Sequence, residues 1–142
     1  MQFDCNAEDR FIGLMSGTSL DGVDAVLVQF PAPQQVSVLG RAHLPYPPTL
    51  RQTLLRLQDT HAGELHQAAC VGNQLATLYA EVVGQLLSIC QLPPSAIKAI
   101  ACHGQTIRHV PEQGYTLQIG DPARLAELRG IDVVADFRSR DI

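Results

Sequence analysis

A short run of hydroxyl, carboxylate and glycine residues between two apolar segments is the part of this sequence best suited to chemistry. Thr18 and Ser19 carry hydroxyls that can donate to phosphate oxygens, and the glycines around them allow close approach of a ligand to the backbone. Successive amides in such a turn form an anion-binding nest. Asp21 and Asp24 would repel a bare phosphate, so their presence indicates Mg²⁺, which prefers oxygen ligands. We predict that Asp21, inside the turn, is the metal ligand.

Two better-known motifs do not fit this turn. Gly17 and Gly22 have the spacing of a Walker loop, but Val23 and Asp24 stand where that loop has lysine and a hydroxyl residue. A nucleophile elbow requires Gly-x-Ser-x-Gly, and here the second glycine comes one position late. An ordinary hairpin turn uses the same residue types. The composition of the turn therefore leaves the phosphate-binding and the plain-turn interpretations open.

The elements around this turn are predicted from periodicity and punctuation. Residues 11–16 and 23–30 form a β-hairpin, because the connection between them is too short for a helical crossover. A third strand is expected over 36–43. Thr49 and Gln52 resemble a capping box that starts a short helix. Apolar residues at three- and four-residue steps predict a longer helix over 63–91, whose core positions include Leu65, Leu75 and Leu86.

The second half of the sequence alternates between strands and helices. A buried-type strand leads into the polar residues 103–106, and a second hairpin follows it. Asp121 is the N-cap of a helix that Gly130 closes. The pattern predicts an α/β fold, a mixed β-sheet with flanking helices. The strands expected here cover residues 97–102, 107–110, 115–119 and 131–137.

Composition narrows the classes of function. Of 142 residues, 46% are apolar and only 17% are charged, which favours a folded core over disorder. The net charge is −4 and basic residues are not clustered, so we expect no nucleic-acid partner. No segment approaches the roughly 18 consecutive apolar residues of a membrane span. The polar N-terminus lacks the apolar core of a signal peptide. We therefore expect a cytoplasmic protein with no membrane partner. Cys70, Cys90 and Cys102 lie in apolar stretches and are predicted to be buried thiols.

Four segments together resemble one protein family. Gly13–Asp24 is similar to the signature that opens anhydro-N-acetylmuramic acid kinases. Cys102–Thr106, Gln118–Asp121 and Val133–Asp141 resemble later family segments in the same order and spacing. The resemblance implies the N-terminal domain of an actin-like, sugar-kinase (ribonuclease H-like) fold, in which two α/β domains enclose a cleft. It also implies ATP-dependent phosphorylation of 1,6-anhydro-N-acetylmuramic acid with hydrolytic ring opening to N-acetylmuramic acid 6-phosphate, in peptidoglycan recycling.

The resemblance also implies roles for individual residues. The opening turn would bind ATP phosphates, with Mg²⁺, and two later segments would contact the sugar. A histidine after a buried strand is more often structural, and Asp136 with Arg138 could instead form an ion pair at a strand end. The residues assigned to ATP are Gly17, Thr18, Ser19, Leu20, Asp21, Gly22, Val23 and Asp24. Those assigned to the small-molecule sugar are His103, Gln105, Thr106, Asp136, Arg138 and Asp141.

The resemblance covers a kinase only in part. We expect residues 1–10 to be a disordered or variable N-terminus and residues 11–142 to be the N-terminal kinase domain, truncated before the second domain. The general base is then expected beyond Ile142, which leaves no catalytic residue to name here. An alternative is a catalytically inactive phosphate- or sugar-binding fragment of such a kinase. The family also suggests a homodimer.

Overall fold

The computed structural model describes residues 6–142, and its first three strands form an antiparallel meander. β1 (Arg10–Ser16) and β2 (Gly22–Gln29) are the predicted hairpin, and β3 (Ser37–Pro45) pairs with β2. Alternate residues of β1 and β2 turn to one face and are buried there. Part of the expected variable N-terminus, residues 1–5, lies outside the described residues, whereas Asp9 forms an ion pair with Lys98 (2.6 Å).

The remaining strands make the sheet mixed, as predicted. β4 (Ala99–Val110) runs parallel to β1, β5 (Tyr115–Ile119) pairs antiparallel with the second half of β4, and β6 (Val133–Ala135) pairs parallel with its first half. The order across the sheet is β3-β2-β1-β4-β5, with β6 beside β4. β1 and β6 run parallel to β4 and both stop beside its middle, opposite Gln105 and Cys102, whereas β4 continues to Val110. The carboxyl ends of parallel strands are where α/β proteins commonly bind ligands.

Two strand boundaries differ from the sequence prediction. The strands expected at 97–102 and 107–110 are one continuous strand. Gly104 (φ 75°) accommodates a local irregularity there, and β4 shifts its pairing register against both β1 and β5. The final strand is shorter than the expected 131–137. It stops at Ala135 because Asp136 adopts a left-handed conformation (φ 60°), after which Phe137–Asp141 form a 3₁₀ turn.

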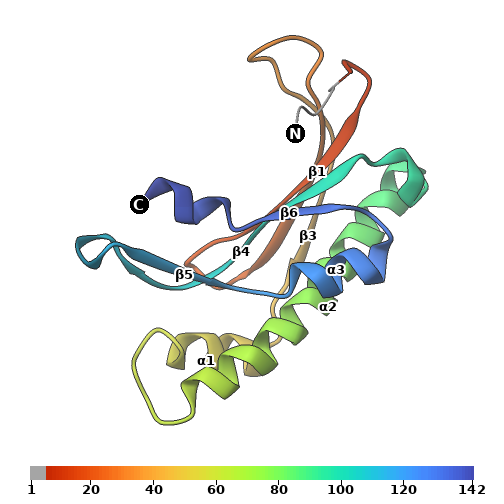
Figure 1. Ribbon diagram of the computed structural model, residues 1–142. Coiled ribbons are helices and arrows are strands. Elements are labelled where there is room, and N and C mark those ends of the chain that lie inside the picture. The colour runs from red at the N-terminus through yellow and green to blue at the C-terminus, as the bar shows by residue number, and fades with distance from the viewer. Residues whose placement is uncertain (1–5) are drawn as a thin grey trace.

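The α-helices of residues 6–142 are three, and Figure 1 shows how they lie relative to the sheet. They are α1 (Pro48–Arg56), α2 (Glu64–Cys90) and α3 (Pro122–Arg129). The capping box expected at Thr49 is wrong: Pro47 is the N-cap of α1, so Thr49 is already inside the helix. The prediction for α3 is confirmed, since the Asp121 carboxylate accepts the Arg124 N–H (2.9 Å) and Gly130 ends the helix with φ 64°.

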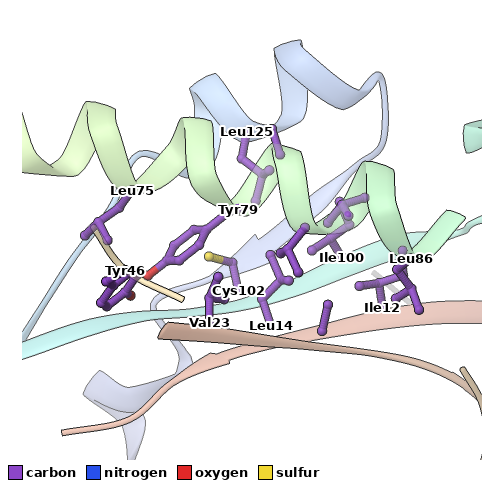
Figure 2. Packing of buried hydrophobic residues seen from close by; sticks show 14 of the residues in the cluster. Ile12, Leu14, Val23, Tyr46, Leu75, Tyr79, Leu86, Ile100, Cys102 and Leu125 are labelled. Atoms are coloured by element: carbon purple, nitrogen blue, oxygen red, sulfur yellow. The ribbon is translucent and has the colours of Figure 1, made fainter. Parts of the chain in front are cut away.

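The core lies between α2 and one face of the sheet (Figure 2). Leu75 and Leu86 are fully buried there, as predicted. The prediction for Leu65 is wrong, because this side chain is 84% exposed in the first turn of α2, before the stretch from Val71 onward that packs on the sheet. The prediction of buried thiols is confirmed for Cys102 alone among the three cysteines of residues 6–142; Cys90 is half-buried, and Cys70 is exposed on α2.

Candidate functional site

The turn between β1 and β2 separates inward-facing from outward-facing side chains. Leu20 and Val23 are fully buried, so any ligand could meet them only through the backbone. Leu20 has a left-handed backbone (φ 55°), and its N–H donates to the Gly17 carbonyl (3.2 Å). Burial of the leucine side chain offsets the cost of that conformation. Thr18 and Ser19 are exposed, and within residues 6–142 their amides have no hydrogen-bond partner. The turn thus leaves the Thr18 hydroxyl and two backbone amides without a hydrogen bond in the described residues, whereas the Ser19 hydroxyl donates to Asp21.

The two glycines of the turn meet different constraints. A Cβ atom at Gly22 would overlap the Leu44 carbonyl oxygen and lie 2.8 Å from the Pro45 Cα, so β3 leaves no room for a side chain there. A Cβ at Gly17 would meet only Ser19, its hydroxyl at 3.6 Å and its backbone nitrogen at 4.0 Å, both ordinary contacts, and the backbone of Gly17 is not left-handed. The fold therefore requires glycine at position 22 but not at position 17.

The two carboxylates near the turn have different partners. The Ser19 hydroxyl donates to Asp21 Oδ1 (2.8 Å), and this hydrogen bond, with backbone amides, holds the pKa of the exposed Asp21 carboxyl below its usual value. Asp24 lies 2.9 Å from His43 Nδ1. Sequence reasoning gave His43 no role, although it stands directly opposite Asp24 in the β2–β3 register, where opposite charges favour pairing. Asp21 is therefore the better candidate for a metal ligand.

The turn supplies at most a partial metal site by itself. Within residues 6–142, no three His, Cys, Asp or Glu side chains are grouped closely enough to hold a metal ion. Mg²⁺ commonly takes one or two carboxylates and completes its octahedron with water and substrate phosphate. A lone Asp21 carboxylate in the same turn as two backbone amides without a hydrogen-bond partner fits that pattern.

A hollow of about 170 Å³ lies where β4, β5 and β6 meet the start of α3. It brings together the three later segments that resemble the kinase family, and its lining runs from Cys102 to Asp136. His103 lies on β4, half-buried and edge-on to the Phe137 ring (centroids 6.1 Å apart), and Asp136 follows β6. The hollow is lined by Cys102, His103, Gly104, Gln118, Ile119, Gly120, Pro122, Ala135 and Asp136.

The ion pair considered for Asp136 and Arg138 does not form. Arg138 instead pairs with Asp141 (3.1 Å), its neighbour in the 3₁₀ turn, and Asp136 accepts a hydrogen bond from the Ser139 hydroxyl (2.5 Å). Neither Arg138 nor Asp141 lines the hollow in the described structure. The 3₁₀ turn thus holds its own charged side chains together while leaving Asp136 at the hollow.

Thr106 and Gln105 do not line the hollow. Thr106 lines a groove with Thr18, so the motif on β4 faces the same open space as the turn. Its hydroxyl accepts a hydrogen bond from the Gln118 side-chain amide (2.9 Å). Gln105 is fully buried and lines neither space; its side chain hydrogen-bonds to protein groups beneath the turn. The residues assigned to the sugar therefore divide among four environments: the hollow, the groove, the buried core and the 3₁₀ turn.

The order of strands and the helices on the sheet define an α/β domain of the sugar-kinase, actin-like type. A family model described as anhydro-N-acetylmuramic acid kinase matches residues 9–142. Curated proteins of that name from Bordetella petrii and Chromobacterium violaceum are 58% and 53% identical over 132 and 139 residues, which is 93% and 94% of this chain. A relative from Neisseria meningitidis is 51% identical over 132 residues. The chain belongs to the anhydro-N-acetylmuramic acid kinase family.

The match covers only part of each relative. The aligned region is 35% of the Bordetella petrii protein and 36% of the Chromobacterium violaceum protein, so the chain spans about a third of the length of these relatives. Within the described residues, no helix is long and apolar enough to cross a membrane.

Asp21→Asn tests the metal role of the turn in the full-length protein. The substitution keeps the shape and the hydrogen bond from Ser19 but removes the charge, so the Mg²⁺ concentration for half-maximal rate should rise about tenfold. Steady-state rates across an Mg²⁺ titration measure this, with Glu112→Gln, which removes an exposed charge on the β4–β5 connection, as the matched control. An unchanged Mg²⁺ dependence in Asp21→Asn would rule out the metal role.

Proposed function

We propose that the full-length protein transfers phosphate from ATP to 1,6-anhydro-N-acetylmuramic acid and opens its anhydro ring with water, giving N-acetylmuramic acid 6-phosphate in peptidoglycan recycling. The observation that carries the proposal is the presence, in one domain, of the glycine turn between β1 and β2 and of a hollow at the middle of β4 and the end of β6, both built from segments typical of this family. The turn supplies the phosphate side and the hollow the sugar side.

The absence of any structural requirement for glycine at position 17 supports phosphate binding. Because neither packing nor backbone conformation requires glycine there, the missing side chain is best explained by close approach of a ligand to the turn. The backbone amides of Thr18 and Ser19 and the Thr18 hydroxyl, which make no hydrogen bond within residues 6–142, are donors that suit phosphate oxygens. Mg²⁺ at Asp21 would offset phosphate charge in place of a loop lysine.

The hollow supports sugar binding. His103 offers a ring nitrogen and Asp136 offers carboxylate oxygens. The proposed sugar presents hydroxyls and an N-acetyl amide, which such groups bind. Arg138, Asp141 and Thr106 are proposed to complete the contacts with the larger substrate, and the general base is proposed to come from the part of the kinase beyond these 142 residues.

The chemistry requires two events at one bridging oxygen. C1 and C6 of the substrate share that oxygen, so phosphoryl transfer to O6 must accompany cleavage of the C1–O bond. Water supplies the new oxygen on C1 and loses a proton to the base, while ADP leaves with the β-phosphate oxygen. Because the reaction consumes ATP, we place it in the cytoplasm, and a homodimer stays a prediction from the family resemblance.

Gly17→Ala separates ligand approach from folding. In the full-length protein the added methyl group should raise the KM for MgATP severalfold while shifting the melting temperature by no more than about 2 °C, because the fold has room for it. Gly22→Ala should instead lower the melting temperature clearly, because its methyl group overlaps backbone of β3. Equal loss of stability in both variants, or an unchanged KM in Gly17→Ala, would contradict the assignment.

Reaction in ¹⁸O-water tests the proposed chemistry directly. We expect the product to carry the label on C1 and to have an unlabelled phosphate ester, as judged by mass spectrometry after rapid quenching. Authentic N-acetylmuramic acid 6-phosphate, incubated for the same time without enzyme, controls for exchange at C1. Label in the phosphate ester, or preference for an ordinary open hexose over the anhydro-sugar, would contradict the proposed function.

A further inference from the structure

Four buried polar side chains lie directly beneath the turn, where an apolar core would otherwise continue. Ser16, Tyr46, Tyr79 and Gln105 are between 0% and 7% exposed. Figure 2 shows Tyr46 and Tyr79 directed toward one another between α2 and the sheet. The Ser16 hydroxyl donates to the Gly104 carbonyl (3.1 Å) and lies 3.0 Å from the Tyr79 hydroxyl. Buried polar groups are retained only where they find partners, so these bonds constrain the backbone they reach.

Tyr46 contacts the turn at both of its ends. Its backbone N–H donates to the Asp21 carbonyl (3.0 Å), which fixes the end of the turn next to β2. Its hydroxyl donates to Gln105 Oε1 (3.0 Å), and Gln105 Nε2 donates to the Gly17 carbonyl (3.2 Å), which fixes the end next to β1. One residue at the end of β3 thus holds both ends of the turn, directly at one and through Gln105 at the other.

The direction of these hydrogen bonds is set by the groups themselves. Gln105 Nε2 faces two carbonyl oxygens, those of Gly17 and Thr106 (3.2 and 3.3 Å), and carbonyls can only accept. The amide nitrogen must therefore point to them, which leaves Oε1 toward Tyr46 and makes the tyrosine hydroxyl the donor. Burial raises the pKa of Tyr46, so this hydroxyl keeps its proton across the physiological range.

We propose that Tyr46 and Gln105 are positioning residues that hold the Gly17–Asp21 turn in the shape that binds the phosphates of ATP, an inference that rests on the proposed function. Gln105 acts from beneath the turn and does not contact the sugar, because its side chain is fully buried and its amide group forms hydrogen bonds with both Tyr46 and Gly17. Removing the Tyr46 hydroxyl leaves Gln105 Oε1 buried without its donor. The side chain then loses its fixed orientation, and the Gly17 carbonyl loses its support.

Tyr46→Phe in the full-length protein tests the proposal. The variant keeps the ring and its packing, and the KM for MgATP should rise about fivefold, the factor associated with one buried hydrogen bond. The KM for the sugar should stay within experimental error. Tyr79→Phe is the matched control, because it also removes a buried hydroxyl from an aromatic ring but not the bond to Gln105. Both variants should lower the melting temperature similarly, and only Tyr46→Phe should change the KM for MgATP.

A double-mutant cycle tests whether Tyr46 acts through Gln105. In a Gln105→Met background, Tyr46→Phe should cause no further rise in the KM for MgATP, because the bridge to Gly17 is already absent. Additive effects would overturn the bridging role. So would an equal rise in the KM for MgATP in Tyr79→Phe, which would indicate general loosening of the core.

A measurement on the native protein keeps the proposal testable if a variant fails to fold. NMR of the Gln105 side-chain amide should show slow exchange with solvent and proximity to the Tyr46 ring, and fast exchange would overturn the proposal. Native protein that does not use MgATP would defeat the proposed function, even with a slowly exchanging Gln105. Native protein that uses MgATP, with an unchanged KM in Tyr46→Phe, would defeat only the positioning role.

Discussion

The hydrogen bond from the buried Tyr46 hydroxyl to Gln105 is the interaction on which the arrangement of this domain's candidate site depends. It connects the end of β3 to the middle of β4, and the Gln105 amide continues the connection to the Gly17 carbonyl. Without it, a polar amide would remain in the core beneath the turn, at a cost of about 1–3 kcal/mol for an unsatisfied buried group. The position of the turn is therefore fixed when the core folds.

The sheet explains why distant segments meet at the candidate site. β1 and β6 both pair parallel with the first half of β4, so the residues that follow β1 and β6 lie near the middle of β4 even though these two strands are far apart in the sequence. Gly104 is the local adaptation that makes this possible on β4. Its left-handed backbone and the register shift beside it let one strand pair with β6 in its first half and with β5 in its second. The hollow forms at that change of partner.

The periodicity of apolar residues was sufficient to predict the order of helices and strands. It failed at positions whose burial depends on tertiary packing. The β1–β2 hairpin, α2, and the Asp121 and Gly130 caps of α3 follow from local patterns, and all are present. Leu65 has the helical phase of the core but lies in the first turn of α2, ahead of the residues that pack on the sheet, so phase alone was misleading. The break expected in β4 was wrong because polar residues within a strand look like a loop when the neighbouring strands are unknown.

The location of the candidate site was predictable from the sequence, but the hydrogen bonds that connect its residues were not. The turn and the later motifs could be found because glycine, hydroxyl and carboxylate residues cluster locally in the sequence. The Tyr46–Gln105 contact joins residues 59 positions apart, and Tyr46 has no local signal that separates it from an ordinary core tyrosine. Only the pairing of Asp24 with His43 was within reach, from the hairpin register. Roles that depend on burial, as for Gln105, required the three-dimensional structure.

The most direct test of the account is a crystal structure of the full-length protein with a non-hydrolysable MgATP analogue and the anhydro-sugar. The account predicts terminal phosphate oxygens within hydrogen-bonding distance of the Thr18 and Ser19 amides, with Mg²⁺ beside Asp21 and the sugar against His103 and Asp136. It also predicts Gln105 still buried beneath the turn, between Tyr46 and Gly17. Phosphates bound away from the Gly17 turn, or a sugar that contacts the Gln105 side chain directly, would contradict it.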